Sequence, residues 1–276
     1  MSVKFSIIVV CLNPGEKLRQ TLNSIKNQKC SDYEIILKDG GSTDGSLDCL
    51  KRMEDLPIKF HSEPDKGIYD AMNEAVKYAE GEYVYFLNCG DCLASPLVLD
   101  SLSTHMGSTL IGDGIKGQES KWVFYGNILQ RTTGQIVASN PVIDGFACFR
   151  NVPCHQACIY DRRLLLAHPF EIKYKIRADY EHFLWCYYQG KASFEYINLV
   201  ISDYEGKGYS EQKANLKVSA REHKEITEKY MSGKELLKYR AIMLATLAPL
   251  RTKLANNAGT AAFYNSIKTL IYRKKR

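Results

Sequence analysis

The 276-residue sequence lacks a long hydrophobic run. Its longest apolar stretch, residues 241–250, is about half of the ~18 residues that a membrane-spanning helix requires. The first residues also lack the basic region and the small-residue cleavage site of a signal peptide. These two absences argue against an integral membrane protein and predict a chain that stays in the cytoplasm.

The common phosphate-binding motifs are absent as well. The chain has no G-x-x-x-x-G-K-[ST] sequence, and no G-x-G-x-x-G follows the first apolar run. The segment at that point, "LNPGEK" (residues 12–17), is too short for a dinucleotide-binding turn. A nicotinamide-dependent oxidoreductase is therefore excluded as an interpretation.

Cysteine is present nine times, but in no arrangement typical of a secreted disulfide framework. The pairs Cys89-x-x-Cys92 and Cys154-x-x-x-Cys158 leave a four-thiolate zinc site open as an alternative. We interpret all nine as small buried thiols in a reducing compartment.

The formal net charge of +6 is unevenly distributed. Residues 207–276 carry 16 Lys/Arg and 5 Asp/Glu, a net of +11, whereas residues 1–206 carry 21 and 26, a net of −5. Such a basic tail favours nucleic acid or an anionic membrane surface, unless it is only a solvated face. We predict a body (residues 1–205) with a basic helical extension (residues 206–276) that contacts the inner face of the cell membrane and no nucleic acid.

The first hundred residues alternate between two hydrophobic periods. β-Branched runs predict strands, and apolar residues at helical spacing, such as Leu18, Leu22 and Ile25, predict helices between them. The predicted strands are residues 5–12, 33–39, 58–63 and 83–88. Repeated β–α units imply an α/β fold, a largely parallel, Rossmann-like sheet flanked by helices.

Polar residues follow each predicted strand. Asn13, Asp39, Asp65 and Asp91 come directly at or after the four strand ends, where ligands of parallel sheets bind. Asx residues also open turns without any further role. Four such residues along one edge nevertheless favour a site for amide donors, sugar hydroxyls or a divalent cation, with Lys66 supplying positive charge.

The motifs "FSIIVVCLN", "LKDGGSTDGS", "EPDKGIYDAMNEAV" and "GEYVYFLNCGD" together resemble family 2 glycosyltransferases of the GT-A fold. The resemblance continues through "PCHQACIYDRRLL" and "IRADYEHFLW", so it covers residues 3–205, and it is closest to bacterial enzymes of capsule and O-antigen synthesis. It implies a nucleotide-sugar-binding half (residues 1–100), an acceptor and catalytic half (residues 101–205), and a UDP-sugar donor.

The same resemblance implies roles for individual residues. Asp39 matches the acceptor of a hydrogen bond from uracil, and Asp91 matches the last acid of the motif that binds Mn²⁺ or Mg²⁺. The family motif is commonly Asp-x-Asp, but this chain has Asn88 at its start, which is a poorer metal ligand. The remaining donor contacts that the resemblance implies are Cys11, Asn13, Asp65, Lys66, Gly67 and Asn88.

The second half is expected to supply the chemistry. Asp179 matches the family's general base, although an Asp at a predicted helix start can simply be a cap; Glu181 is the weaker candidate. His155 and Gln156 match a pair near the donor diphosphate or the acceptor, and the alternative for His155 is a buried structural group. Residues 122–129 and 135–139 predict a hairpin with acceptor contacts.

Three helices are predicted beyond the body, at residues 211–231, 234–254 and 260–272. The last has an apolar stripe beside basic residues, which suits a membrane interface. The chain lacks the Q-x-x-R-W motif of polymerising synthases, so we expect transfer of one sugar to a saccharide or a polyprenyl-diphosphate-linked acceptor. A sugar nucleotidyltransferase and a catalytically inactive nucleotide-sugar-binding subunit remain as alternatives.

Overall fold

The computed structural model describes residues 4–112, 120–206 and 213–246. The chain divides into two compact units, residues 1–226 and 227–276, and each is described by itself. The predicted helix at residues 260–272 lies outside the described residues, as do parts of the helices predicted at 211–231 and 234–254.

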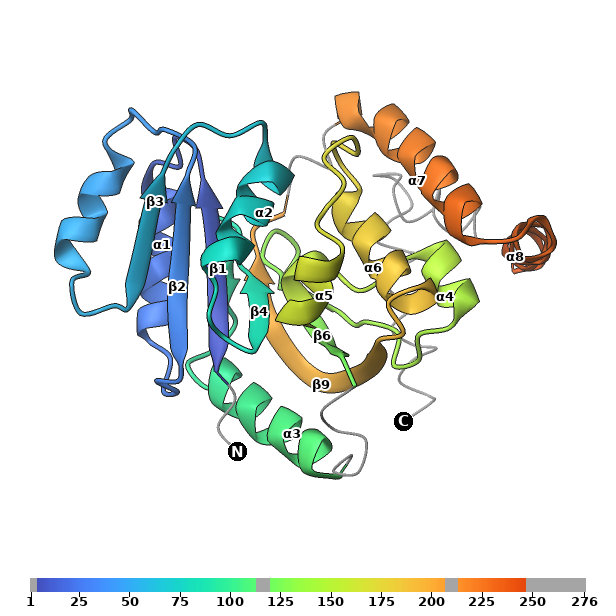
Figure 1. Ribbon diagram of the computed structural model, residues 1–276, viewed down its shortest axis with the longest axis horizontal. Helices are drawn as coiled ribbons and strands as arrows, with labels where there is room; N and C mark the ends of the chain where they lie inside the picture. The colour runs from blue at the N-terminus through green and yellow to red at the C-terminus, as the bar shows by residue number, and fades with distance from the viewer. Residues whose placement is uncertain (1–3, 113–119, 207–212, 247–276) are drawn as a thin grey trace. The chain divides into compact units, whose positions relative to one another are not determined.

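The first unit begins with the predicted β–α repeats. The four strands pair in parallel in the order β3-β2-β1-β4, and α1 and α2 cover opposite faces of them (Figure 1). The elements are β1 (Phe5–Cys11), α1 (Glu16–Lys26), β2 (Tyr33–Asp39), the 3₁₀ helix η1 (Ser46–Arg52), β3 (Ile58–Ser62), α2 (Ile68–Tyr78) and β4 (Tyr83–Phe86).

The sheet continues past β4 with strands of both directions. β8 pairs antiparallel with both β4 and β6, and β9 pairs in parallel with β6. The path ends in the short β5, which is antiparallel to β9. The predicted hairpin is confirmed, because β7 pairs antiparallel with β6. These elements are β5 (Cys92–Leu93), α3 (Val98–Gly112), β6 (Trp122–Gln130), β7 (Gln135–Val137), α4 (Gly145–Arg150), η2 (His155–Ala157), β8 (Cys158–Asp161), α5 (Arg162–Ala167), α6 (Ala178–Tyr188) and β9 (Ser193–Tyr204).

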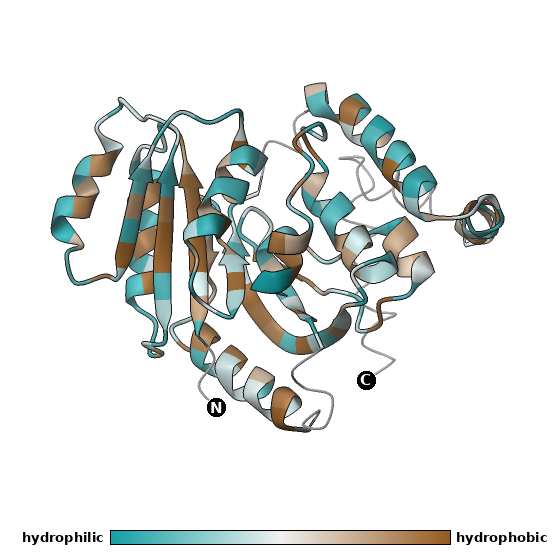
Figure 2. Cartoon of the chain, in the orientation of Figure 1, coloured by the Kyte–Doolittle hydropathy of each residue, from teal (hydrophilic) through white to brown (hydrophobic). Residues whose placement is uncertain are grey.

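The core explains why these segments adopt their structures. β1 and β2 are buried along nearly their whole length, as apolar strands covered on both faces must be. Leu18, Leu22 and Ile25 place one face of α1 against them, and all three are fully buried. In Figure 2 the apolar colour follows the strands and the polar colour follows the outer helix faces.

At the amino ends of the strands, one buried carboxylate fastens three strands together. Glu34 on β2 accepts hydrogen bonds from Ser6 Oγ (2.6 Å) and from the backbone N–H groups of Glu80 (2.6 Å) and Gly81 (3.0 Å). Its second oxygen pairs with Lys59 Nζ on β3 at 2.8 Å. A Cβ at Gly81 would lie 2.7 Å from the backbone nitrogen of Ser6, so this close approach requires glycine.

Two helices follow the body. Residues 216–230 form α7 (Leu216–Tyr230), after a 3₁₀ turn η4 (Lys213–Asn215). In the second unit α8 (Gly233–Ala245) begins with a capping box between Ser232 and Glu235. None of the helices in the described ranges combines the length and the apolar character needed to cross a bilayer.

Candidate active site

The carboxyl ends of β1, β2, β3 and β4 bring the predicted polar residues to one edge of the sheet. Asn13 joins the first two loops, since its N–H donates to Ser42 Oγ (2.7 Å) and its Oδ1 accepts from Thr43 N (2.9 Å). The third loop lies against the second, because a Cβ at Gly40 would be 2.6 Å from Asp65 Oδ2. The predicted edge is therefore one connected surface.

Asp39 is fully buried at the end of β2 and accepts several hydrogen bonds. Gly41 N and Ser42 N donate to it at 3.0 Å, Ser62 Oγ donates at 2.7 Å, and Ser42 Oγ and the thiol of Cys11 also contact it. Burial raises the pKa of Asp39, but the hydrogen bonds from Ser42 and Ser62 outweigh it and leave the pKa below its usual value. A carboxylate has about four lone-pair positions, so a further donor reaches Asp39 only if a serine hydroxyl turns away.

The loop after β3 forms a tight turn into α2. Asp65 Oδ1 accepts from Gly67 N at 2.8 Å, and Lys66 N donates to Asp70 Oδ2 at 2.9 Å. Gly67 has φ 124°, a backbone conformation that glycine adopts most easily. The Lys66 side chain is exposed at this edge.

Asp91 is buried just past β4, with 4% of its surface exposed. Its Oδ1 accepts from Glu205 N (2.8 Å), and its Oδ2 accepts from Gln156 Nε2 (3.0 Å). Burial is the main cause that raises its pKa to about 6, against the lowering effect of these two hydrogen bonds. Thr21 Oγ1 fixes the turn by accepting from Gly90 N (2.9 Å) and donating to the Asp91 carbonyl (2.8 Å).

Two cationic side chains surround this turn. Arg131 Nη1 donates to the Gly90 carbonyl at 3.1 Å and also pairs with Asp203. Lys17 Nζ pairs with Glu205 at 2.7 Å. Neither residue was predicted from the sequence, although both are basic residues beside predicted strand ends or turns.

Two buried polar groups near Asp91 have no hydrogen-bond partner among the described residues. They are Asn88 Oδ1 and both ring nitrogens of His155. The His155 ring stacks on Phe86, with centroids 5.0 Å apart, and burial lowers its pKa while the charge of Asp179 opposes that shift. Because buried polar atoms are nearly always paired in proteins, these groups mark a surface suited to a ligand.

Asp179 is the second residue of α6, but it does not cap this helix. The residue at the cap position, Arg177, makes no side-chain cap bond. Instead the buried carboxylate of Glu222 accepts from the N–H groups of Lys175 (2.9 Å), Ile176 (3.1 Å) and Arg177 (3.0 Å). The Asp179 carboxylate accepts from the Tyr69 hydroxyl at 2.9 Å, and among the described residues no backbone N–H donates to it, so it does not have the capping role that Asp often has near a helix start.

Glu181 belongs to a different cluster. It is fully buried, and His168 Nε2 contacts its two oxygens at 3.0 and 3.2 Å. With Glu171 these residues place three potential ligand atoms within 4.8 Å of one another, but Lys173 already pairs with Glu171 at 2.9 Å. This cluster is an ion-pair group apart from the strand ends.

The η2 segment lies between the surroundings of two predicted site residues, Asp91 and Asp179. Gln156 holds Asp91, and its neighbour His155 lies within the electrostatic influence of Asp179. This short segment therefore links the end of the sheet edge at Asp91 to the surroundings of the predicted base. For a divalent cation, Asp91 retains a free lone pair on each oxygen and Asn88 offers an unpartnered carbonyl, so these oxygen donors fit such an ion.

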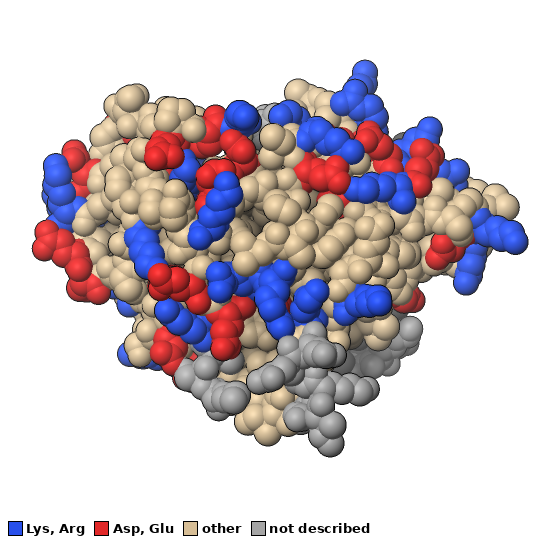
Figure 3. Space-filling view, viewed as in Figure 1, with Lys and Arg blue, Asp and Glu red and all other residues tan. Residues whose placement is uncertain are grey.

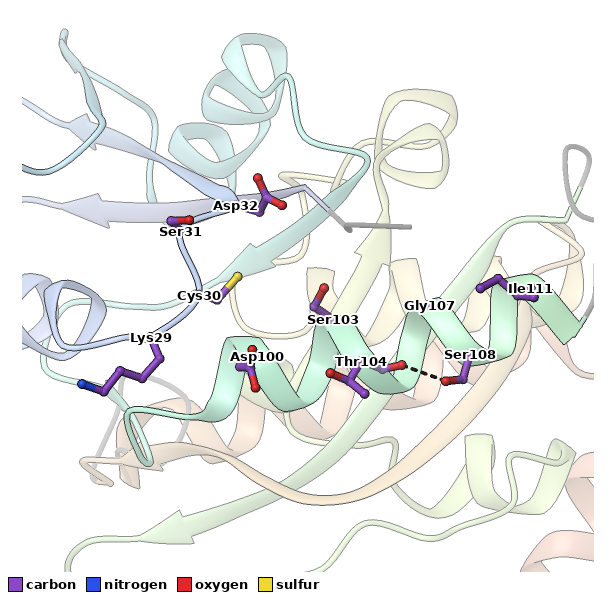
Figure 4. Close-up of a pocket in the computed structure, with 10 residues that line it drawn as sticks. All are labelled: Lys29, Cys30, Ser31, Asp32, Asp100, Ser103, Thr104, Gly107, Ser108 and Ile111. Atoms are coloured by element: carbon purple, nitrogen blue, oxygen red, sulfur yellow. Dashed lines mark hydrogen bonds between the residues drawn. The ribbon is translucent and has the colours of Figure 1, made fainter.

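Cavity volume alone does not locate this site. A hollow of about 520 Å³ lies between residues 29–32 and α3, where Asp100, Ser103 and Thr104 line it (Figure 4). Asp32 immediately precedes β2, so this hollow is at the amino ends of the strands. It is opposite the edge that gathers Asp39 and Asp91.

Comparison with known proteins gives the family. The family model described as "Glycosyl transferase family 2" matches residues 6–138. The "PGL/p-HBAD biosynthesis glycosyltransferase" of Mycobacterium bovis is 32% identical over 210 residues, covering 74% of this chain and 77% of its own length. The chain belongs to glycosyltransferase family 2, and it is a glycosyltransferase.

Solved structures give the fold. The chain resembles Staphylococcus aureus TarS residues 1–349 with a TM-score of 0.57 and 20% identity, over 73% of this chain and 60% of that one. It also resembles the mannosyltransferase PcManGT from Pyrobaculum calidifontis, in complex with GDP-Man and Mn²⁺, with a TM-score of 0.56 and 16% identity, over 98% and 86%. The predicted GT-A fold is confirmed.

Proposed function

We propose that this enzyme is an inverting, divalent-metal-dependent glycosyltransferase that moves one sugar from a UDP-sugar to a saccharide or polyprenyl-diphosphate-linked acceptor. The process would be synthesis of a cell-surface glycan. The observation that carries the proposal is that two carboxylates lie around the same short segment η2: Asp91 is held by Gln156, and the charge of Asp179 acts on the adjacent His155.

The donor would lie along the carboxyl ends of β1 to β4. Asp39 would receive the uracil N–H in place of a serine hydroxyl, and Cys11, Asn13 and the residues 65–67 would contact the nucleoside and its sugar. Two relatives support the choice of UDP and of a cell-surface glycan. TarS has been solved in complex with UDP-GlcNAc, and a "Poly(ribitol-phosphate) beta-glucosyltransferase" of Bacillus spizizenii is 34% identical over 103 residues.

The diphosphate would lie beside Asp91 and Asn88. A bound Mn²⁺ or Mg²⁺ supplies positive charge that offsets the charge developing on the leaving diphosphate. Lys17, Lys66 and Arg131 would add to that charge, and the unpartnered ring of His155 would donate to a phosphate or acceptor oxygen. Gln156 would orient the Asp91 carboxylate.

Asp179 would act as the general base. The acceptor oxygen bonds to the anomeric carbon while its proton passes to Asp179, and the bond from that carbon to the diphosphate breaks with its electron pair on UDP. One displacement inverts the configuration, so an α-linked donor gives a β-linked product. The acceptor is expected near the β6–β7 hairpin, where Ile136 and Val137 are exposed.

The test is Asp179→Asn, which keeps the size of the side chain but removes its ability to take the proton. We expect turnover to fall by about 10²–10⁴ with donor affinity nearly unchanged. Asp144→Asn is the matched control, because Asp144 caps α4 through Ala147 N (2.7 Å) and should leave turnover unchanged. An α-linked product, or near-normal turnover in Asp179→Asn, would refute the mechanism. A wild-type protein that binds UDP-sugars without turnover would instead be a binding subunit.

The basic region at residues 207–276 would attach the enzyme to an anionic membrane surface. Each Lys or Arg near such a surface contributes about 1 kcal/mol. In Figure 3 the two signs of charge are interspersed over the drawn face. Deleting residues 260–276 should reduce sedimentation with anionic vesicles while UDP release continues. An intact chain that ignores such vesicles at low salt would rule out this attachment.

A further inference from the structure

Tyr69 makes a contact with the proposed base that the sequence did not reveal. Its hydroxyl lies 2.9 Å from Asp179 Oδ1 and 2.9 Å from the carbonyl oxygen of Ile176. Tyr69 is the second residue of α2, directly after the loop at residues 65–67 that faces the donor edge. Burial, followed by the charge of Asp179, raises the pKa of Tyr69 well above its usual value, so the hydroxyl keeps its proton.

One hydroxyl proton cannot serve both acceptors at once. A hydrogen bond to an ionised carboxylate is roughly twice as strong as one to a neutral carbonyl, so the proton points to Asp179 when that residue is ionised. Oδ1 of Asp179 is then engaged, and among the described residues no hydrogen bond to Oδ2 is found. Oδ2 is therefore the oxygen available for the acceptor's proton.

The tyrosine is held rigidly between the two halves of the domain. Asn73 lies one turn further along α2, and its side chain makes two hydrogen bonds with the backbone of Phe170. Asn73 Nδ2 donates to the Phe170 carbonyl (2.9 Å), and Phe170 N donates to Asn73 Oδ1 (2.9 Å). The Tyr69 ring also packs on the Phe170 ring, with centroids 5.5 Å apart. The helix that begins at the donor loop is thus fastened to the segment that leads into α6.

We propose that Tyr69 is a positioning residue for Asp179. It holds Oδ1 so that Oδ2 meets the acceptor hydroxyl, and it ties the orientation of the base to the loop under the donor. This inference rests on the proposed function, in which Asp179 takes the proton.

Tyr69→Phe removes the hydroxyl and keeps the ring. With UDP-glucose or UDP-N-acetylglucosamine, Mn²⁺ and water as acceptor, we expect kcat for UDP release to fall about 10- to 100-fold, while KM for the donor changes less than about twofold. In an Asp179→Asn background the same substitution should have almost no further effect on kcat, because the carboxylate that Tyr69 orients can no longer take a proton there. Equal losses in both backgrounds would overturn the proposal.

Tyr174→Phe is the matched control. Tyr174 is buried, Tyr69 is half-buried, and Tyr174 likewise donates to a carboxylate, that of Glu225, at 3.0 Å. The Tyr174→Phe substitution removes the same type of hydrogen bond from the same domain. It should therefore lower the thermal stability by a similar amount without lowering kcat. If Tyr174→Phe lost as much kcat as Tyr69→Phe, the loss in Tyr69→Phe would be explained by general destabilisation, and the positioning role would be rejected.

A spectroscopic measurement separates this inference from the proposed function. In protein labelled with ¹³C at the aspartate carboxyl, the Asp179 resonance is identified by its absence in Asp179→Asn. At pH 7.5 it should move in Tyr69→Phe and stay in place in Tyr174→Phe. An unmoved resonance overturns the Tyr69 contact whatever the activity. A moved resonance in a protein that releases no UDP from any donor leaves the contact standing and rejects the proposed function.

Discussion

Glu34 and Asp91 are buried carboxylates at opposite ends of the same parallel strands, and their surroundings have opposite effects. Burial raises the pKa of Glu34, but the bonds from Lys59, Ser6 and two backbone N–H groups outweigh it and hold the pKa at about 2. Asp91 has two hydrogen-bond donors among the described residues, and burial leaves its pKa at about 6. The amino end of the sheet therefore stabilises its buried charge more completely than the carboxyl end does.

This difference is the one expected between a structural acid and an acid that binds a ligand. The three donors around Glu34 Oε1 and the ammonium of Lys59 leave little for a ligand to contribute. Around Asp91, the unpartnered groups of Asn88 and His155 add to an incompletely compensated carboxylate. Proteins commonly lose stability at a site that is shaped for a ligand. A bound cation would supply the positive charge that the surroundings of Asp91 lack.

The largest expected effect comes from removing the charge of Asp91. In Asp91→Asn we expect UDP release to fall by at least about 10³-fold at any Mn²⁺ concentration, because the charge on the leaving diphosphate loses its metal anchor. Steady-state kinetics across a Mn²⁺ series measure this. Recovery of wild-type turnover at high Mn²⁺, or full wild-type activity in a chelator, would contradict the assignment.

Glu34→Gln should have the opposite profile. It breaks a buried ion pair that bridges β2 and β3, so we expect the free energy of unfolding to fall by about 3 kcal/mol. Turnover per folded molecule should remain within about twofold, because Glu34 lies at the far end of the strands. Urea unfolding and active-site-normalised kinetics on the same preparations test both halves of this statement.

The smallest expected effect is on the pH dependence of the free energy of unfolding, to which the two acids contribute in opposite directions. The folded-state pKa of Asp91, about 6, lies above its ordinary value of 3.8, so the folded state binds the proton more tightly. Its contribution to the free energy of unfolding is present below pH 4 and is lost as pH rises through about 6, amounting to about 3 kcal/mol at most. For Glu34, with a folded-state pKa of about 2 against 4.5, the contribution is present above pH 4.5 and is lost as pH falls toward 2.

Urea unfolding of the metal-free protein between pH 4.5 and 7.5 measures the Asp91 effect as a difference. Relative to the wild type, Asp91→Asn should become more stable as pH rises through about 6, by about 1 to 3 kcal/mol at pH 7.5. If the difference in the free energy of unfolding between the two proteins did not change with pH, burial of the ionised Asp91 carboxylate would not destabilise the folded protein.

The sequence predicted the parallel half of the sheet and the edge at which its polar residues gather. Those predictions depend on local patterns, namely β-branched runs such as Phe5–Cys11 and polar residues at strand ends. The surroundings of the site depend on partners far apart in the chain and have no local signal. Glu205 and Asp91 are 114 residues apart, and Tyr69 and Asp179 are 110 apart.

Asp179 shows most clearly why sequence alone was insufficient. An aspartate near a helix start predicts a cap as well as a base. The partner of its side chain, the hydroxyl of Tyr69, lies 110 residues away in the chain and has no local signal. The mixed direction of β8 and β5 was likewise unpredictable, because strand pairing in the second half follows from tertiary packing. The predicted site residues themselves remain predictions that mutagenesis has to test.

Calorimetric titration of UDP tests the difference between the two carboxylates most directly. In Mn²⁺ at pH 7.5, the wild type and Glu34→Gln should bind UDP with the same Kd to within about twofold, and Asp91→Asn should bind at least about tenfold more weakly. A chelator should weaken UDP binding to the wild type and to Glu34→Gln by a similar factor, and should change Asp91→Asn little. Equal UDP affinity in all three proteins, with and without the metal, would contradict the assignment of Asp91 as the functional acid.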